Sequence, residues 1–218
     1  KSQGSDVGFD PEFAASRDVQ YKIRIRNTVQ LQGLAQCDAG VSPTQWQKST
    51  FPKLFHPLIH VIHEGLDLNA LRPNPNATFT LPNGKTLDRQ TKVITFVSRQ
   101  LEPYRGFHTF MRALPELQRR LPDTHFVIVG ADGVSYGGPP PKGFANYREW
   151  MMKEVGGSLD LSRTHCVGRI LYQSYVSLLQ ISRLHIYLTY PFVLSWSMLE
   201  AMACGAPVLA SATPPVQE

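Results

Sequence analysis

The spacing of apolar residues changes near Lys92, and the part after that residue gives the clearest indication of a fold. Short apolar runs rich in β-branched residues are separated there by segments whose apolar residues recur three and four positions apart. The runs predict strands at 93–97, 125–129, 164–167, 184–188 and 207–210. The spaced segments predict helices at 106–120, 146–155, 172–181 and 197–203. Apolar strands alternating with amphipathic helices indicate a parallel sheet covered on both faces, so we expect an α/β, Rossmann-like, doubly wound domain.

The part before Lys92 has a weaker pattern. Residues 1–16 predict a loop or extended lead-in, and residues 17–35 predict an amphipathic helix with a basic face. A solvated face is the favoured interpretation of that helix, and contact with a membrane surface is the alternative. The other elements expected in this part are a short strand ending in a turn at 38–44, a helical turn at 45–49, a buried strand at 58–62, and an irregular excursion at 69–90 with a hairpin around Pro82-Asn83-Gly84.

Size and charge limit the classes of protein to be considered. With 218 residues and a formal net charge of +5, the chain suits one domain plus extra segments and an anionic partner, such as a nucleoside diphosphate, a lipid head group or a nucleic acid. The basic residues are dispersed and form no ladder with aromatic residues, which argues against nucleic acid. The three cysteines show no disulfide or zinc spacing, and no run of about 20 apolar residues predicts a membrane span. We therefore expect a cytoplasmic protein, with peripheral contact at the inner membrane left open.

Chemically useful residues lie where the predicted strands end. In a doubly wound sheet, ligands bind outside the carboxyl ends of the strands, so the loops after Val97, Val129, Val167 and Leu188 should meet at one cleft. The first loop, 98–106, carries Arg99 and Arg105, whose guanidinium groups could hold a diphosphate from two sides. The alternative is that both are surface arginines paired with Glu102, and spacing alone does not decide between them.

A second candidate is the start of the predicted helix at 197–203. The first turn of a helix leaves backbone N–H groups without intrahelical acceptors, which makes it a phosphate site, and Glu200 would lie in that turn, within reach of a ribose. However, Ser197-Met-Leu-Glu200 also fits a capping box, in which Glu200 only accepts from the backbone of Ser197. Both interpretations remain open at this point. The histidines show no spacing typical of a metal site, and we expect none.

Four ordered motifs resemble one known family. His63-Glu-Gly-Leu-Asp67 is similar to "NGvD", and Val97-Ser-Arg99 with Arg105-Gly106 is similar to "GRL…KG". His165-Cys-Val-Gly168 resembles "F-x-G", and Leu199-Glu-Ala-Met-Ala-Cys-Gly-Ala-Pro-Val208 resembles "EAMAcGxPV", the most specific of the set. Together they resemble the donor domain of the GT-B retaining glycosyltransferases of the fourth sequence family, the glycosyl transferases group 1.

The resemblance implies roles for individual residues. It implies that Arg99 and Arg105 bind the donor diphosphate and that Glu200 binds the ribose, and we take these three as the catalytic set. It implies further donor-binding residues at Gly168, Arg169, Ile170, Phe192, Val193, Leu194, Ser195, Trp196 and Ser197. Two positions depart from the family pattern: Arg105 stands where lysine is usual, and Phe192 stands where the first glutamate of the E-x7-E motif is usual.

The resemblance also implies an organisation and a reaction. Residues 1–57 would be the tail of an acceptor domain, and residues 58–218 a donor-binding domain cut short at its C-terminus. We expect a bacterial enzyme of polysaccharide biosynthesis that moves a sugar from a nucleoside diphosphate sugar to a saccharide or lipid-linked acceptor with retention, without cofactor or metal. This fragment would bind donor only and be inactive alone. The alternatives are a GT-B nucleotide-sugar epimerase and a non-catalytic nucleotide-binding module.

Overall fold

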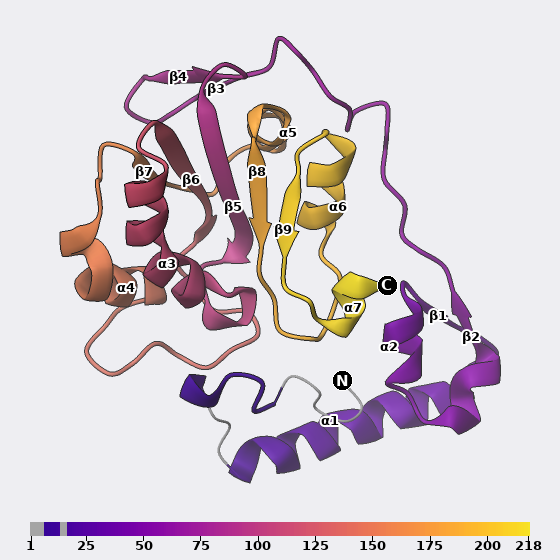
Figure 1. Ribbon diagram of the computed structural model, residues 1–218. Helices are drawn as coiled ribbons and strands as arrows, with labels where there is room; N and C mark the ends of the chain where they lie inside the picture. Colours follow the sequence, from indigo (N-terminus) through magenta and orange to yellow (C-terminus); the bar gives the residue numbers. More distant parts are fainter. Residues whose placement is uncertain (1–6, 14–16) are drawn as a thin grey trace. The chain divides into compact units, whose positions relative to one another are not determined.

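The computed structural model describes residues 7–13 and 17–218, which divide into two compact units (Figure 1). Unit 1 comprises the described residues up to Gly65 together with Tyr190–Leu194 and Ala212–Glu218. Unit 2 comprises Leu66–Thr189 and Ser195–Ser211. The domain boundary predicted after Pro57 lies inside unit 1.

Unit 2 is built on a parallel sheet. Its strands are β5 (Lys92–Gln100), β6 (Thr124–Ala131), β7 (Thr164–Gly168), β8 (Leu184–Tyr187) and β9 (Val208–Ala210). They lie in the order β7-β6-β5-β8-β9, and every pairing is parallel. The chain adds β6 and β7 on one side of β5 and then returns to add β8 and β9 on the other. This reversal makes the sheet doubly wound, which confirms the predicted fold class.

Helices connect the strands and cover both faces. They are α3 (Phe107–Arg120), α4 (Tyr147–Val155), α5 (Tyr172–Ile181) and α6 (Trp196–Ala203), with short 3-10 turns η3 (Pro103–Arg105) and η4 (Gly156–Ser158). On one face, Phe96 of β5 stacks on Phe110 of α3, with ring centroids 4.8 Å apart. Val93 has the opposite parity on β5, so it faces the other side, where it packs with Leu178 and Ile181 of α5.

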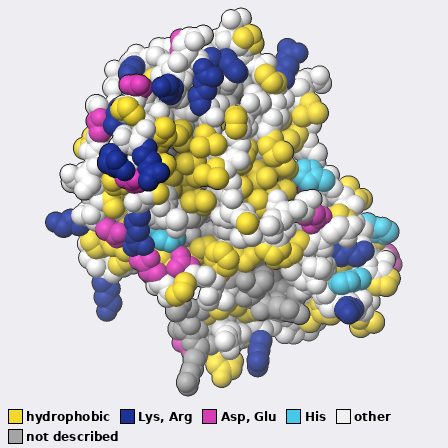
Figure 2. Space-filling view, in the orientation of Figure 1, with side chains coloured by type: hydrophobic (Ala, Val, Ile, Leu, Met, Phe, Trp, Pro, Cys, Tyr) yellow, Lys and Arg dark blue, Asp and Glu magenta, His cyan; other side chains and the backbone are white. Residues whose placement is uncertain are grey.

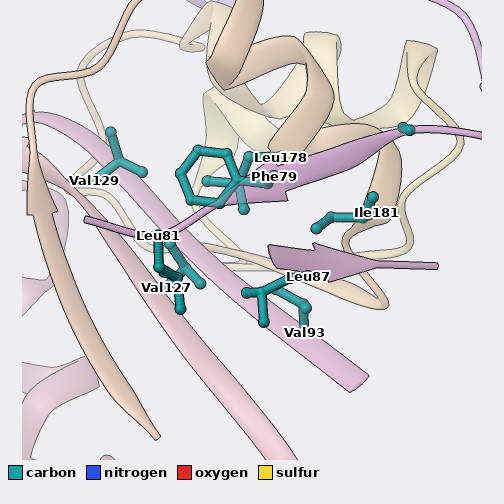
Figure 3. Close-up of a cluster of buried hydrophobic side chains, with 9 residues drawn as sticks. Phe79, Leu81, Leu87, Val93, Val127, Val129, Leu178 and Ile181 are labelled. Carbon is teal, nitrogen blue, oxygen red and sulfur yellow. The ribbon is translucent and has the colours of Figure 1, made fainter. Parts of the chain in front are cut away.

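A hairpin completes the core on the α5 side. Its strands β3 (Thr78–Thr80) and β4 (Thr86–Asp88) pair antiparallel, as the sequence predicted around Pro82-Asn83-Gly84. Phe79, Leu81 and Leu87 of this hairpin converge on the β5, β6 and α5 side chains (Figure 3). The hairpin therefore supplies part of the sheet's apolar cover.

Unit 1 consists of η1 (Pro11–Phe13), α1 (Arg17–Gln36), β1 (Gly40–Ser42), α2 (Gln45–Ser49), η2 (Lys53–Leu58), β2 (Ile59–Val61) and α7 (Pro214–Gln217). The strands β1 and β2 pair parallel. At the start of α2, the Glu218 carboxylate accepts hydrogen bonds from the backbone N–H groups of Gln45 and Trp46, at 2.6 and 2.7 Å. The N-terminal turn of α2 is thus satisfied by the chain's last residue.

Several predicted elements differ in detail. Strand β5 runs on to Gln100, so Arg99 lies in the strand and not in the loop after it. Strand β2 is shorter than predicted and only Ile59 in it is buried. Helix α6 begins at Trp196, and α7 was not predicted. The part of the predicted lead-in at residues 1–6 and 14–16 lies outside the described residues.

Candidate functional site

The candidate site lies at the carboxyl ends of β5 and β8, where the strand order reverses. In doubly wound sheets this switch point is where ligands bind, because the loops from the two strands leave in opposite directions. The two loops approach closely here. Gly106 is the N-cap residue of α3 and has a φ of +66°, and a Cβ built on it would lie 2.3 Å from the Cβ of Leu188.

Arg105 is held at this point by three groups of unit 2. Its Nη1 donates to the hydroxyl of Tyr187 at 3.4 Å and to Oγ1 of Thr189 at 3.3 Å. Its guanidinium also lies 5.5 Å from the ring centroid of Tyr136, within range of a cation–π interaction. The side chain is half-buried. A permanent positive charge is therefore fixed at the end of β8.

Glu102 has a structural role in this region. Its side chain is buried, and its carboxylate accepts hydrogen bonds from the backbone N–H groups of Ser135, Tyr136 and Gly137, at 3.0 to 3.2 Å. The carboxylate thereby fixes the loop that carries Tyr136. The alternative in which Glu102 pairs with surface arginines is wrong, because its oxygens are bonded to backbone amides.

Arg99 is in a different position from Arg105. It lies within the last residues of β5 and its side chain is exposed, between buried Ser98 and half-buried Gln100. Among the described residues, no hydrogen bond or ion pair holds its guanidinium. The diphosphate role predicted for Arg99 remains a prediction.

The start of α6 is linked to Arg105 through Tyr187. Ser195 is the N-cap residue, and its backbone N–H donates to the Tyr187 hydroxyl at 2.9 Å. The same phenol oxygen accepts from Arg105. The hydroxyls of Ser195 and Ser197 lie 3.3 Å apart. A guanidinium and a helix N-terminus therefore lie on two sides of one buried tyrosine, an arrangement suited to binding a doubly charged anion.

Glu200 does not cap α6. Helix α6 begins at Trp196, so Ser197 lies inside the helix and Glu200 follows the first turn. Its buried carboxylate accepts hydrogen bonds from two phenols of α5, the Tyr172 hydroxyl at 2.8 Å on Oε1 and the Tyr175 hydroxyl at 2.6 Å on Oε2. Burial and the hydrogen bond to this carboxylate raise the pKa of Tyr172 to about 12. The capping-box alternative is therefore wrong.

The glycine turn predicted as a donor contact ends strand β7. Gly168 has a φ of +70°, Arg169 is exposed, and Ile170 packs against the apolar cluster beneath the hairpin. Ile170 thus has a packing role in this structure. The donor contacts predicted for this turn remain predictions.

The segment Phe192–Leu194 is part of unit 1. Phe192 is buried, and Val193 and Leu194 are half-buried. The neighbouring Tyr190 donates a hydrogen bond to the Asp10 carboxylate at 2.9 Å, and its ring lies 5.1 Å from that of Phe9. In unit 2, Trp196 is 53% exposed. The donor roles of these four residues remain predictions.

Sequence reasoning missed five residues of this site: Tyr136, Tyr187 and Thr189 around Arg105, and Tyr172 and Tyr175 of α5, which bind Glu200. Tyr187 and Thr189 close an apolar strand, and only their position at a strand end marked them. Over the part of unit 2 seen in Figure 2, Lys and Arg side chains stand in separate small groups with hydrophobic side chains between them. That scatter differs from the continuous basic surface typical of nucleic-acid binding.

Comparison with known proteins identifies the family. A family model described as "Glycosyl transferases group 1" matches residues 91–218, more than half of the chain. The chain belongs to this family. A second model, "Glycosyl transferase family 4 group", matches residues 1–71.

A curated relative and several solved structures are also similar to this group 1 chain. A GDP-mannose-dependent alpha-(1-6)-phosphatidylinositol monomannoside mannosyltransferase of Mycolicibacterium smegmatis is 35% identical over 89 residues, which cover 40% of this chain and 23% of the relative. Sucrose-phosphate synthase from Thermosynechococcus elongatus matches with a TM-score of 0.67 and 20% identity, covering 94% of this chain and 48% of the synthase. HepE from Anabaena, solved with UDP-glucose, matches with a TM-score of 0.62 and 19% identity, covering 89% of this chain and 50% of that protein.

Each of these matches covers only part of the similar protein. The chain spans about half the length of the synthase and of HepE and 23% of the length of the mannosyltransferase, and the structural matches are evidence for the fold. Among the described residues, no helix combines the length and apolarity needed to cross a bilayer.

Proposed function

We propose that this chain is the donor-binding part of a glycosyltransferase that moves a sugar from a nucleoside diphosphate sugar to an acceptor hydroxyl with retention of configuration. The observation that carries the proposal is the hydrogen-bonded link from Arg105 through Tyr187 to Ser195. It holds a guanidinium and a helix N-terminus side by side at the sheet's switch point, where both can contact one pyrophosphate.

The chemistry follows from where charge develops. Departure of the diphosphate from the sugar concentrates negative charge on the leaving group, and groups that stabilise this charge lower the barrier. Arg105 supplies a permanent positive charge, and the first turn of α6 supplies backbone N–H donors. The nucleoside diphosphate sugar is the substrate, and the proposed mechanism requires neither cofactor nor metal.

Glu200 is proposed to orient the nucleoside. A buried carboxylate is a strong acceptor, and the two hydroxyls of a ribose are hydrogen-bond donors. The two oxygens of Glu200 already receive two hydroxyl donors in this structure, from Tyr172 and Tyr175. The carboxylate is thus suited to accept a hydrogen bond from a ribose hydroxyl.

The donor and acceptor are proposed as classes. One similar protein is named for GDP-mannose and another was solved in complex with UDP-glucose, which supports a nucleoside diphosphate sugar as donor and leaves its base open. The mannosyltransferase is named for a lipid-linked acceptor, which supports a saccharide or lipid-linked acceptor for the whole protein. We accordingly propose a role in bacterial polysaccharide biosynthesis, in the cytoplasm or at the inner membrane surface.

A second candidate is a non-catalytic nucleotide-binding module. It is favoured by Phe192, a buried apolar side chain at the position where the family usually has a glutamate. Both candidates predict nucleotide binding, whereas only a transferase releases nucleoside diphosphate when donor and acceptor are supplied to the whole protein. Turnover of a donor panel by the full-length parent separates the two.

Calorimetric titration of UDP and of GDP into the wild type and Arg105→Ala tests the site. Removing a charge-assisted contact to a diphosphate should weaken the better-binding nucleotide at least about tenfold. The matched control is Arg120→Ala, an exposed arginine of α3 that pairs with Glu116. Equal affinities of wild type and Arg105→Ala would rule out the proposed diphosphate contact.

A further inference from the structure

Two tyrosines of one helix hold the same carboxylate. Tyr172 and Tyr175 are three residues apart on α5, so their side chains project from the same face. Their ring centroids are 5.8 Å apart, and each hydroxyl donates to a different oxygen of Glu200. Neither hydrogen bond caps α6, because the N-cap residue of that helix is Ser195.

The two tyrosines differ in how firmly they are held. Tyr175 packs against the apolar cluster formed by residues such as Leu71, Leu179 and Cys204, which fixes its ring. Tyr172 stands at the first position of α5 and is 55% exposed, although its hydroxyl is bonded to a buried carboxylate. Tyr172 can therefore leave Glu200 by a change of side-chain rotamer, whereas Tyr175 would have to leave its packing.

We propose that in the free protein the Tyr172 hydroxyl occupies the hydrogen-bonding position on Oε1 of Glu200 that a ribose hydroxyl takes when a nucleoside diphosphate binds. The inference rests on the proposed function and concerns the same site. Binding then exchanges one hydroxyl donor for another. The Tyr172 side chain rotates away from Glu200 into the solvent, whereas the Tyr175 hydroxyl stays on Oε2 and keeps the carboxylate in place.

The exchange has an energetic consequence. A ligand must break the bond between Tyr172 and Glu200 before it can make its own, so part of its interaction is spent on displacement. In the free protein, the two tyrosines also ensure that the buried carboxylate of Glu200 has hydrogen-bond donors, which avoids the cost of burying a charge without partners. Tyr172 accordingly weakens nucleotide binding while protecting Glu200, and Tyr175 supports binding.

The test compares Tyr172→Phe and Tyr175→Phe with the wild type, each titrated with UDP and with GDP in a calorimeter. We expect Tyr172→Phe to bind the preferred nucleotide about three- to tenfold more tightly, as when one net hydrogen bond no longer has to be broken. Tyr175→Phe should bind it more weakly. Equal or weaker binding by Tyr172→Phe overturns the inference. If the wild type binds neither nucleotide, the proposed function itself fails.

A second measurement on the wild type does not depend on how the variants fold. In protein labelled with ¹³C at the tyrosine ring, the Tyr172 signal is identified by its loss in Tyr172→Phe. Nucleotide should move this signal to the position of a solvent-exposed tyrosine, while the Tyr175 signal keeps its hydrogen-bonded position. A Tyr172 signal that stays in place although the nucleotide binds overturns the inference.

Discussion

Gly106 is the residue at which the two sides of the switch point come closest. Its φ of +66° belongs to the left-handed region, which favours glycine, and its α-carbon faces the side chain of Leu188. A side chain at this position is opposed twice, by the backbone torsion and by the Leu188 Cβ only 2.3 Å away. The residue therefore sets how near η3 and Arg105 can lie to the end of β8.

Gly106→Ala should lower the free energy of unfolding by roughly 2–5 kcal/mol, the sum of about 1–2 for the left-handed torsion and 1–3 for overpacking. Urea denaturation measures the change. The matched control is Gly84→Ala, which shares a positive φ of +86° but has no atom within 4 Å of the added Cβ. The control should lose only the torsional part. Equal losses in the two variants would mean that the contact with Leu188 carries no weight.

At the scale of elements, the β3–β4 hairpin acts as a cover for one face of the sheet. Its buried residues Phe79 and Leu87 pack with Val93 of β5 and with Leu178 and Ile181 of α5 (Figure 3). A two-stranded hairpin has little stability alone, so its strands depend on this packing. The hairpin and the sheet should therefore stabilise each other.

Leu87→Ala tests that dependence. Leu87 is fully buried, so truncation should cost about 2–5 kcal/mol of unfolding free energy, from lost burial and the cavity left behind. Leu209→Ala of β9 is the control, because Leu209 is 54% exposed and its truncation should change stability by less than about 0.5 kcal/mol. Denaturation curves of the two variants give the comparison. Similar costs at both sites would contradict the assigned packing.

Elements with a strong local signal could be predicted from the sequence, and those defined by tertiary contacts could not. Helix α5 has the predicted ends, and the hairpin lies at the predicted turn. The last residues of β5 are polar, so the predicted strand ended at residue 97, three residues before the end of β5. The bonds from Tyr172 and Tyr175 to Glu200 join residues 28 and 25 positions apart, and no periodicity reveals such pairs. Arg105 and the start of α6 could be placed because strand ends meet at one edge of a parallel sheet.

At the scale of the whole molecule, stability should depend on pH through a buried and a half-buried histidine of unit 2. His185 is fully buried, its Nδ1 lies 3.0 Å from Oγ1 of Thr95, and burial lowers its pKa to about 4. His165 stacks on His125, and burial together with the nearby charge on His125 lowers the pKa of His165 to about 4. Nδ1 of His125 lies 2.9 Å from Nε2 of His165, and Lys85 donates a hydrogen bond to Nε2 of His125 at 2.8 Å.

The sign of the effect follows from proton binding. Unfolded histidine has a pKa of about 6.5, so between about pH 6.5 and 4 the unfolded chain binds more protons than the folded one. The contribution of these histidines to the free energy of unfolding is therefore fully present above about pH 6.5 and is lost as the pH falls towards 4. A single fully buried group such as His185 accounts for at most about 3 kcal/mol. The midpoint of urea denaturation should therefore be lower at pH 4.5 than at pH 7.5.

His165→Asn provides the matching variant for that measurement. Asparagine does not titrate, so the difference between the two midpoints should shrink relative to the wild type. The lowered carboxyl pKa values of Glu116 and Asp160, both about 2, act at lower pH and leave this window to the histidines. An unchanged difference would exclude His165 as a source of the acid sensitivity.

The shared oxygen of Tyr187 has a consequence for association kinetics and entropy. Because one phenol bonds both the arginine and the backbone amide of Ser195, the N-cap of α6, the distance between the two is set before any ligand arrives. An incoming anion meets partners whose side chains have already lost their rotational freedom. Less ordering remains to be done on binding, so discrimination among anions should depend on the length of the ligand rather than on its charge alone.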